Sequence, residues 1–464
     1  MFTLCDRYGR HGRREFLKVG GLTLGGLSLG ELIKARAEAA RSSRPVTDKS
    51  VIFLFMHGGP SQTETFDPKM TAPAGVRSVT GEIATTIPGV TFGSTFRKLA
   101  QLAHEFSVVR SFTTGDSRHD IKPIVHRDTF QANIGSIYSR VAGTTHPLTG
   151  LPNNAALYPQ SVDASTMPAI KEFGDFEATG AFGSANAPFV PGAGGEMQQN
   201  MTLSMPMQRV NDRRKLLAQL DDFRKSFDTV EGLGSVNTIR RQAYDVILGG
   251  AAQAFDLSKE DPRVVARYDT SPLVKPEQID TRWNNRKRYI DNAKTLGKQL
   301  LLARRLCERG CGFVTVTTNF VWDMHADQNN AGVEEGMGYM GVPFDHAVSA
   351  FIEDVTARGL SDRILLVCCG EMGRTPKLNS RGGRDHWGNL APLLLYGGGL
   401  KMGQVVGRST RDAGAPSSHP VTIKNLLATI LHTLFDVGEL RVVPGVPSDI
   451  AQTMTGWSPI RELV

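Results

Sequence analysis

The sequence has few cysteines and no cysteine motif. None of its five cysteines stands in the C-x-x-C spacing of thiolate zinc sites and redox motifs. Cys307 and Cys311 are four residues apart at a predicted helix end, and Cys368 and Cys369 are adjacent in an apolar run. We interpret both pairs as small buried hydrophobic residues rather than as disulfides or metal ligands. A structural zinc site held by thiolates is disfavoured as well.

Long apolar runs, repeats and a strong charge imbalance are also missing. The segment after Lys18 is apolar but short and rich in glycine, which disfavours a stable transmembrane helix. The formal net charge is +7, and part of this excess lies in the first 44 residues, in Arg7, Arg10, Arg13, Arg14, Lys18, Lys34, Arg36, Arg41 and Arg44. The small remainder does not indicate nucleic-acid binding. No internal repeat or low-complexity tract is present.

Residues 1–44 have the pattern of an export signal followed by a short linker. The pair Arg13-Arg14 precedes Glu-Phe-Leu-Lys, the glycine-rich apolar run and an Ala-x-Ala sequence. This order resembles a twin-arginine signal peptide with cleavage near residues 35–40. It predicts a periplasmic or extracellular protein whose partner during export is the twin-arginine translocase. Because this pathway carries folded proteins, often already loaded with a metal or cofactor, the signal gives weak support for a metal site.

The composition and the apolar pattern predict an α/β fold. Hydrophobic residues make up 40% of the chain and charged residues 21%, as in a globular protein with a large core. Short apolar runs predict buried strands at 50–56, 106–112, 312–318, 363–369 and 392–396. Periodic apolar residues predict helices at 207–227, 236–255, 282–310, 344–358 and 421–435. Their alternation favours a mostly parallel sheet between helices.

We assign residues 45–464 to a single domain with an insertion around 143–310. The first part of the insertion, 143–206, is irregular and contains many Pro, Gly, Ala and Asn residues. A segment of this length without predicted structure is typical of a lid or a substrate-shaping loop. The rest of the insertion is helical in pattern.

Candidate ligands and reactive groups follow or neighbour the predicted strands. Parallel strands place their C-terminal loops at one edge of a sheet, so these groups can converge although they are distant in sequence. Imidazole nitrogens and carboxylate oxygens together suit Zn²⁺, Mn²⁺ or a similar cation. Ordinary solvated loops, or helix caps in the first loop, are the alternative. The residues concerned are His57, Glu64, Ser117, His119, Asp323, His325, Glu371, Asp385 and His386.

Four motifs in order make the sequence similar to a known family. They are FLFMHGGPSQTETFDPK, WDMH, GEMGRTP and GGRDHW, and together they resemble the domain-of-unknown-function-1501 family over essentially the whole mature chain. That family looks like a branch of the alkaline phosphatase and sulfatase superfamily. The resemblance implies an alkaline phosphatase-like α/β fold with a mostly parallel central sheet flanked by helices.

The same resemblance implies a divalent metal, Zn or one of Mn, Ca and Mg, and suggests its ligands. Asp323 and His325 match a ligand pair, and His386 matches the late histidine of the same site. Glu371 stands where an aspartate of a second site is usual, although Met372 replaces the histidine that normally follows it. The loop from His57 to Glu64 would supply an early ligand. Asp385 is either a ligand or a partner that orients His386.

The resemblance implies a metal-dependent hydrolase of phosphate or sulfate esters, with a small-molecule or polysaccharide substrate. Ser117 is the best candidate nucleophile, while Thr113, Thr114, Ser61 and a metal-activated water remain alternatives. His119 is a candidate acid or base. Charge in the transition state would be offset by Arg118, Arg374 or Arg384. A different reading is a non-catalytic binding or scaffold module with a degenerate metal site, whose partner is a carbohydrate or another exported protein.

Overall fold

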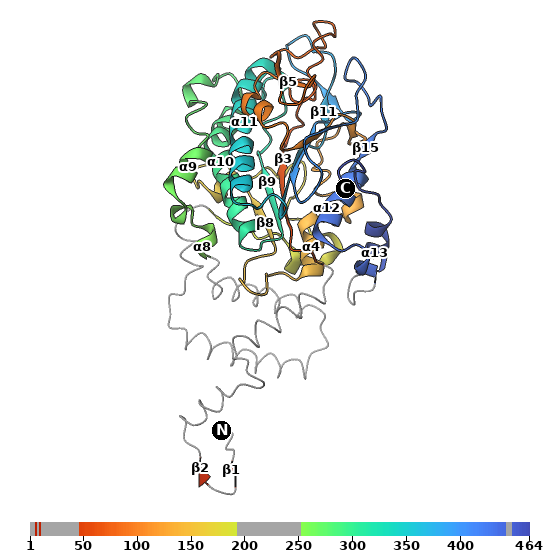
Figure 1. Ribbon diagram of the computed structural model, residues 1–464. Helices are drawn as coiled ribbons and strands as arrows, with labels where there is room; N and C mark the ends of the chain where they lie inside the picture. Colours follow the sequence, from red (N-terminus) through yellow and green to blue (C-terminus); the bar gives the residue numbers. More distant parts are fainter. Residues whose placement is uncertain (1–4, 7–8, 11–45, 193–251, 442–447) are drawn as a thin grey trace. The chain divides into compact units, whose positions relative to one another are not determined.

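The computed structural model describes residues 5–6, 9–10, 46–192, 252–441 and 448–464 (Figure 1). The chain forms two units, Met1–Pro45 and Val46–Val464. In the first unit, β1 (Cys5–Asp6) pairs with β2 (Gly9–Arg10). The rest of the predicted signal lies outside the described residues, as do the predicted helix at 207–227 and most of the one at 236–255. Within the described ranges, no helix is long and apolar enough to cross a membrane.

A seven-stranded sheet organises the second unit, in the order β14-β6-β13-β10-β3-β9-β8. All neighbouring strands are parallel except that β13 is antiparallel to both β10 and β6. The α/β class with a mostly parallel central sheet is therefore confirmed. The strands are β3 (Ser50–Phe55), β6 (Ser107–Val109), β8 (Asn154–Leu157), β9 (Phe313–Thr317), β10 (Ile364–Cys369), β13 (Leu393–Gly397) and β14 (Val405–Val406).

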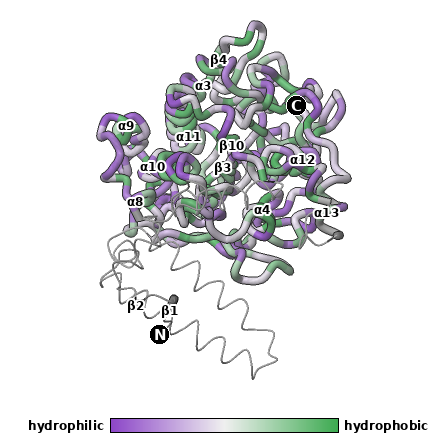
Figure 2. Tube along the Cα trace, turned by 60° about the horizontal axis from the view of Figure 1, so that its bottom comes forward, coloured by the Kyte–Doolittle hydropathy of each residue, from purple (hydrophilic) through white to green (hydrophobic). Residues whose placement is uncertain are grey.

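Helices cover both faces of this sheet. Ile52 and Leu54 of β3 belong to one apolar cluster with α10 (Arg286–Glu308) and α11 (Val333–Ala357). Val51, Phe53 and Phe55 point the other way, into a cluster with α4 (Ile134–Ala142) and α12 (Ile423–Leu434). Figure 2 shows β3 and β10 between these two helix layers. Because both faces are buried, the central strands are continuously apolar rather than alternating.

The central strands end at the same level of one sheet edge. Phe55 at the end of β3 pairs in register with Cys369 on one side and with Thr317 on the other. The polar loops that follow β3, β9 and β10 therefore start side by side. This edge carries the candidate site, as expected for an open parallel sheet.

Shorter elements complete the described chain. The helices are α3 (Arg97–Gln101), α8 (Ala252–Phe255), α9 (Pro262–Tyr268) and α13 (Ser448–Thr455). Three two-stranded sheets pair β4 (Glu82–Ala84) with β5 (Thr91–Gly93), β7 (Phe112–Thr113) with β15 (Val421–Thr422), and β11 (Gly373–Arg374) with β12 (His386–Trp387).

Candidate metal centre

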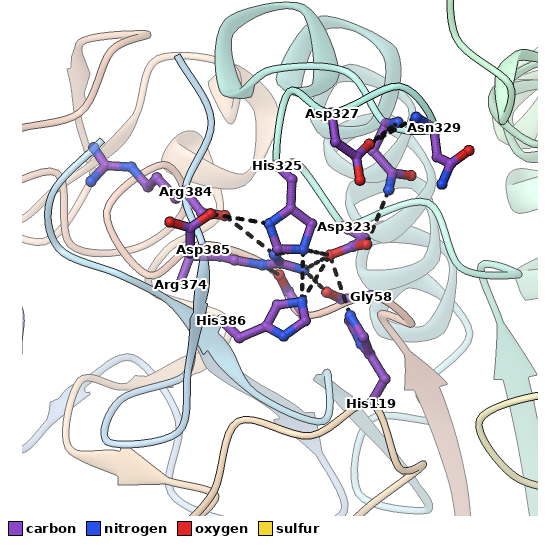
Figure 3. Close-up of polar contacts among 12 residues, drawn as sticks. Gly58, His119, Asp323, His325, Asp327, Asn329, Arg374, Arg384, Asp385 and His386 are labelled. Atoms are coloured by element: carbon purple, nitrogen blue, oxygen red, sulfur yellow. Dashed lines mark hydrogen bonds and ion pairs between the residues drawn. The ribbon is translucent and has the colours of Figure 1, made fainter. Parts of the chain in front are cut away.

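Three imidazoles surround one carboxylate oxygen at this sheet edge (Figure 3). One donor atom from each of His119, Asp323, His325 and His386 lies within 4.8 Å of the other three. Asp323 Oδ1 is 2.8 Å from His325 Nε2 and 3.4 Å from Nε2 of both His119 and His386. Nitrogen and carboxylate donors gathered at one point are the chemistry of a divalent metal site.

The four residues come from three separate loops. His119 follows β7, Asp323 and His325 follow β9, and His386 begins β12 after the long loop that leaves β10. The sequence prediction included all four residues but gave His119 the role of an acid or base. In the structure His119 lies with the three predicted ligands, and its buried Nε2 makes no hydrogen bond to any described residue. A lone nitrogen directed at this point fits a metal ligand.

Glu371 orients His119 rather than joining the four donors. Its Oε1 is 2.8 Å from His119 Nδ1, and both of its oxygens accept from the backbone N–H of Gly58, at 2.9 and 3.2 Å. An ionised carboxylate only accepts, so His119 carries its proton on Nδ1 and turns the Nε2 lone pair to the centre. Burial lowers the pKa of His119, but the nearby carboxylates of Asp323 and Glu371 outweigh burial and raise it.

Asp385 has a similar place beside another imidazole. Its Oδ1 is 3.3 Å from Nδ1 of His325 and accepts from Asn379 Nδ2 at 3.0 Å. Sequence reasoning offered Asp385 as a ligand or as the partner of His386, and the structure places it against His325 instead. Glu371 and Asp385 are thus the outer carboxylates of two carboxylate–histidine pairs, an arrangement that fixes ring orientation in metal sites.

Asp323 is held as an anion. Burial would raise the pKa of Asp323, but the Arg374 guanidinium and the hydrogen-bonded imidazoles hold it well below its usual range. Asn330 Nδ2 donates to Oδ2 at 3.0 Å, which leaves Oδ1 directed at the three histidines. The carboxylate is therefore charged and aimed before any ligand arrives.

Arg374 places a fixed positive charge against the centre. Its guanidinium is buried, and Nη2 lies 2.5 Å from Asp323 Oδ1. Nε donates to the carbonyl of Gly59 at 2.7 Å, and Nη1 lies 3.3 Å from His325 Nε2. The guanidinium is therefore held in one orientation against Asp323 and His325. Of the predicted arginines, Arg374 is the one that contacts the four residues.

Arg384 and Glu64 form a separate, fully buried ion pair. Arg384 Nη2 lies 2.9 Å from Glu64 Oε1, and neither side chain is exposed to solvent. Glu64 also accepts from Ser78 Oγ at 2.7 Å and from the N–H of Val79 at 3.0 Å. Glu64 was predicted as a metal ligand and Arg384 as an anion contact. The structure instead pairs them with each other, outside the four-residue group.

His57 also lies outside that group. It is buried among the rings of Phe173, Phe176 and Phe320, and neither ring nitrogen makes a hydrogen bond to a described residue. Burial lowers the pKa of His57 to about 4, so the ring is neutral at pH 7. Phe173 and Phe320 also pack on His119, at 5.1 and 4.9 Å between ring centroids. His57 therefore belongs to the aromatic wall beside the centre.

Ser117 and Arg118 stand on the loop that carries His119, but both are exposed. The guanidinium of Arg118 pairs with Asp116 at 3.1 Å. Within the described part of the chain, neither residue makes a hydrogen bond or an ion pair with the four donors. The roles given to them from sequence, nucleophile and transition-state partner, stay predictions.

Gly58 and Asn330 contact residues of the candidate centre, and sequence reasoning did not single them out. Gly58 adopts φ +112°, and a Cβ at this position would lie 2.5 Å from the backbone nitrogen of Asp323. Only glycine permits the first-strand loop to approach the ligand loop this closely. The Gly-Gly pair after the first strand was the signal for this approach, while nothing local marked Asn330.

Comparisons with solved structures find low identity and low overall superposition. Ps i-CgsB is 11% identical, with 89% of this chain and 77% of that chain covered at a TM-score of 0.35. Its complex with k-i-k-neocarrahexaose gives 10% identity, 83% and 72% coverage and a TM-score of 0.31. The PsFucS1 sulfatase from Pseudoalteromonas sp. is 13% identical, with 97% of this chain and 78% of that chain covered at a TM-score of 0.30. We draw no functional argument from likenesses at this level.

Comparison with protein families gives a firmer result. The sequence matches no curated protein closely enough to count as a relative. Residues 48–440 match the family of proteins of unknown function DUF1501, a span that includes every residue of the candidate centre. The chain therefore belongs to the DUF1501 family.

Proposed function

We propose that this protein is a metal-dependent hydrolase of sulfate or phosphate esters. The observation that carries the proposal is the convergence of His119, Asp323, His325 and His386 beside the buried guanidinium of Arg374. A divalent ion held by the four donors would polarise an ester oxygen and lower the pKa of an attacking hydroxyl or water. The resemblance to the alkaline phosphatase and sulfatase superfamily, carried by the WDMH and GGRDHW motifs, favours the same chemistry.

The donor set favours Zn²⁺ or Mn²⁺. Three imidazole nitrogens and one carboxylate suit these ions, whereas Ca²⁺ and Mg²⁺ prefer oxygen donors throughout. We propose a single ion, because Glu371 is already engaged by His119 and Gly58. In the described part of the chain no second group of this kind occurs. The guanidinium of Arg374 supplies the additional positive charge.

Arg374 would offset the negative charge of the ester through its fixed positive charge rather than through a direct hydrogen bond. Its five N–H groups are directed at acceptors on Gly58, Gly59, Asp323, His325 and Arg384, which fixes the guanidinium in place. A positive charge fixed in advance stabilises the charge that develops on the ester oxygens without reorganising during the reaction. Access would come past His386, whose side chain is 30% exposed and is the most open of the four.

Ser117 remains the proposed nucleophile, with a water molecule as the alternative. It stands two residues before His119 on the same loop, and its side chain is exposed. Ser117→Ala separates the two readings. Loss of turnover with metal retained supports the serine, and unchanged turnover assigns the attack to water.

We also propose an exported protein that acts on small-molecule or polysaccharide esters. The twin-arginine pattern at Arg13-Arg14 supports a periplasmic or extracellular location. Lysine at both positions should leave the precursor in the cytoplasm. Normal export of that variant would contradict the assignment of a twin-arginine signal.

One observation favours a second candidate, a non-catalytic binding module. Four protein ligands are enough to close a tetrahedral zinc site, and closed sites are usually structural. In that case the ion would hold the three loops together and the surface above them would bind a carbohydrate or protein. The experiment below distinguishes the two functions.

The test combines metal analysis with an ester screen. We would measure metal content and turnover of aryl sulfates and aryl phosphates for the wild type and for Asp323→Ala/His325→Ala. The exposed pair His104→Ala/Glu105→Ala is the matched control. The hydrolase is supported if the wild type holds one equivalent of Zn or Mn and turns over an ester. Both properties should be lost in Asp323→Ala/His325→Ala and kept in the control. Metal without turnover supports the binding module, and no metal after reconstitution contradicts both.

A further inference from the structure

A pocket is lined by the loop that leads to the candidate ligand His119. It has a volume of about 420 Å³, and its walls come from the loop after β7, from the 3-10 helix η1 (Arg127–Thr129) and from the first turn of α12. Arg118 in its wall directly precedes the candidate ligand His119. The backbone N–H groups of Thr114 and Gly115 donate to the carbonyl of Gly388, both at 3.1 Å, two residues beyond His386. The pocket and the centre therefore share two chain segments.

The charge of this pocket is mainly positive. Its lining includes Arg118, Arg127 and Lys424, and the acids beside them are Asp116 and Asp128. Asp116 is engaged by Arg118 at 3.1 Å and by the buried ammonium of Lys122 at 2.8 Å, and Lys122 also pairs with Asp120 at 2.6 Å. Four cationic side chains, Arg118, Lys122, Arg127 and Lys424, therefore stand against three carboxylates, Asp116, Asp120 and Asp128, which leaves a net positive charge.

Arg127 and Lys424 are exposed, and neither makes an ion pair with a described residue. They come from different segments, η1 and α12, and meet only at this pocket. The amino end of α12, a 12-residue helix, adds the positive end of its dipole to the same wall. Pockets of this volume are large enough for a sugar-sized group.

We propose that this pocket binds a second anionic group of the substrate, a sulfate, phosphate or carboxylate, while the ester to be cleaved lies at the metal centre. This inference rests on the proposed hydrolase function and narrows its substrate class to molecules with at least two anionic groups. It also gives Arg118 a role in holding substrate rather than in the transition state. One loop contributes to both binding points, and the proposal requires that one ligand spans them.

The test is a binding measurement on the metal-loaded protein. Calorimetry at low ionic strength would compare a disulfated disaccharide with its monosulfated counterpart, using the wild type and Arg127→Gln/Lys424→Gln. We expect the wild type to bind the disulfated sugar about tenfold more tightly, as charge-assisted contacts to one extra anion provide. The variant should lose this preference and keep its metal content. Both side chains are exposed, so the fold should not change.

Arg97→Gln/Lys98→Gln is the matched control, because it removes the same charge from the exposed start of α3. An equal loss in this control would show general charge attraction and would overturn the inference. No preference for the disulfated sugar in the wild type would overturn it as well. Failure of the hydrolase proposal gives a different result. The wild type would still prefer the disulfated sugar and the Arg127→Gln/Lys424→Gln variant would still lose this preference, but no ester would be cleaved.

Discussion

Glu371 and His119 form a buried carboxylate–imidazole pair, with Oε1 2.8 Å from Nδ1. This contact fixes the ring so that Nε2 meets the other three donors. Glu371→Gln keeps the shape of the side chain but weakens the hydrogen bond that orients the His119 ring. It also lowers the basicity of His119 Nε2. We expect metal affinity to fall about 10- to 100-fold, as is usual when such a partner is lost. Competition with a chelator measures the change.

Asp385→Asn is the comparison for that experiment. Its carboxylate is 55% exposed and lies 3.3 Å from His325 Nδ1. Water can therefore replace much of its hydrogen bond to the His325 ring. The loss of metal affinity should be clearly smaller than in Glu371→Gln. Equal losses in the two variants would show that burial of the pair does not matter.

Arg374→Lys tests the proposed charge beside the ion. Lysine keeps the charge but lacks the fork that holds it against Gly58, Gly59 and Asp323 at the same time. We expect turnover to fall about 100-fold or more, the usual effect of removing a fixed donor to developing charge. Metal content should not fall. Arg381→Lys, exposed on the same loop, is the control, and simultaneous loss of metal and turnover in Arg374→Lys would assign it to holding the ion.

The ion pair between Arg384 and Glu64 should dominate local stability, because both side chains are fully buried. Arg384→Met leaves a charged carboxylate in the core, which costs about 3–5 kcal/mol of unfolding free energy. Replacing both, as Glu64→Gln/Arg384→Met, should recover a large part of that loss. Urea unfolding of the two variants gives the comparison. A double variant less stable than the single one would contradict the argument.

Asp345 should make stability depend on pH. It is buried, and burial raises its pKa from 3.8 to about 6, against the opposing hydrogen bonds from the N–H groups of Lys98 and Leu99. The native state therefore binds this proton more tightly than the unfolded state does. The corresponding stability is present below pH 4 and is lost as pH rises through 6, by roughly 3 kcal/mol at most.

Asp345→Asn should remove this part of the pH dependence. Urea unfolding at several pH values between 4 and 7 would show a flatter decline in unfolding free energy than in the wild type. The exposed Asp362→Asn is the control and should follow the wild type. If the unfolding free energy had the same pH dependence in the wild type, Asp345→Asn and Asp362→Asn, Asp345 would not be the group responsible.

The central strands could be predicted closely, because burial on both faces leaves an unmistakable apolar run. The run at 50–56 became β3 and the run at 363–369 became β10, each within a residue or two. The run at 106–112 instead divides into β6 and the start of β7, since the two pair with different sheets. Strand β8 was missed inside the irregular region 143–206, where Asn154 begins a strand of only 4 residues.

Helix α11 shows how local signals mislead. It was predicted at 344–358 but begins at Val333, with Pro343 inside it. Gly336 and Gly341 weaken the helical pattern, yet each stands where a Cβ would meet Met324 or Thr95 closely. Close packing therefore explains the glycines that local propensity counts against a helix.

The candidate centre could be predicted as a set of residue types but not as a geometry. Strand ends and spacing pointed to Asp323, His325 and His386, which lie together in the structure. The same reasoning could not separate ligands from their partners, because Glu371 and Asp385 also follow the strands. Only the three-dimensional arrangement shows that Glu371 faces His119 and that Glu64 is taken by Arg384.

The origin of the four donors in three distant loops also sets an order of events during folding. His119 and His386 meet only after the strands that precede them in the chain, β7 and β10, have both taken their places in the fold. An incomplete chain offers at most the neighbouring Asp323 and His325, which is too few donors to retain an ion. An ion held by these four donors would thus be captured after assembly of the sheet, and its presence would mark a molecule that has finished folding.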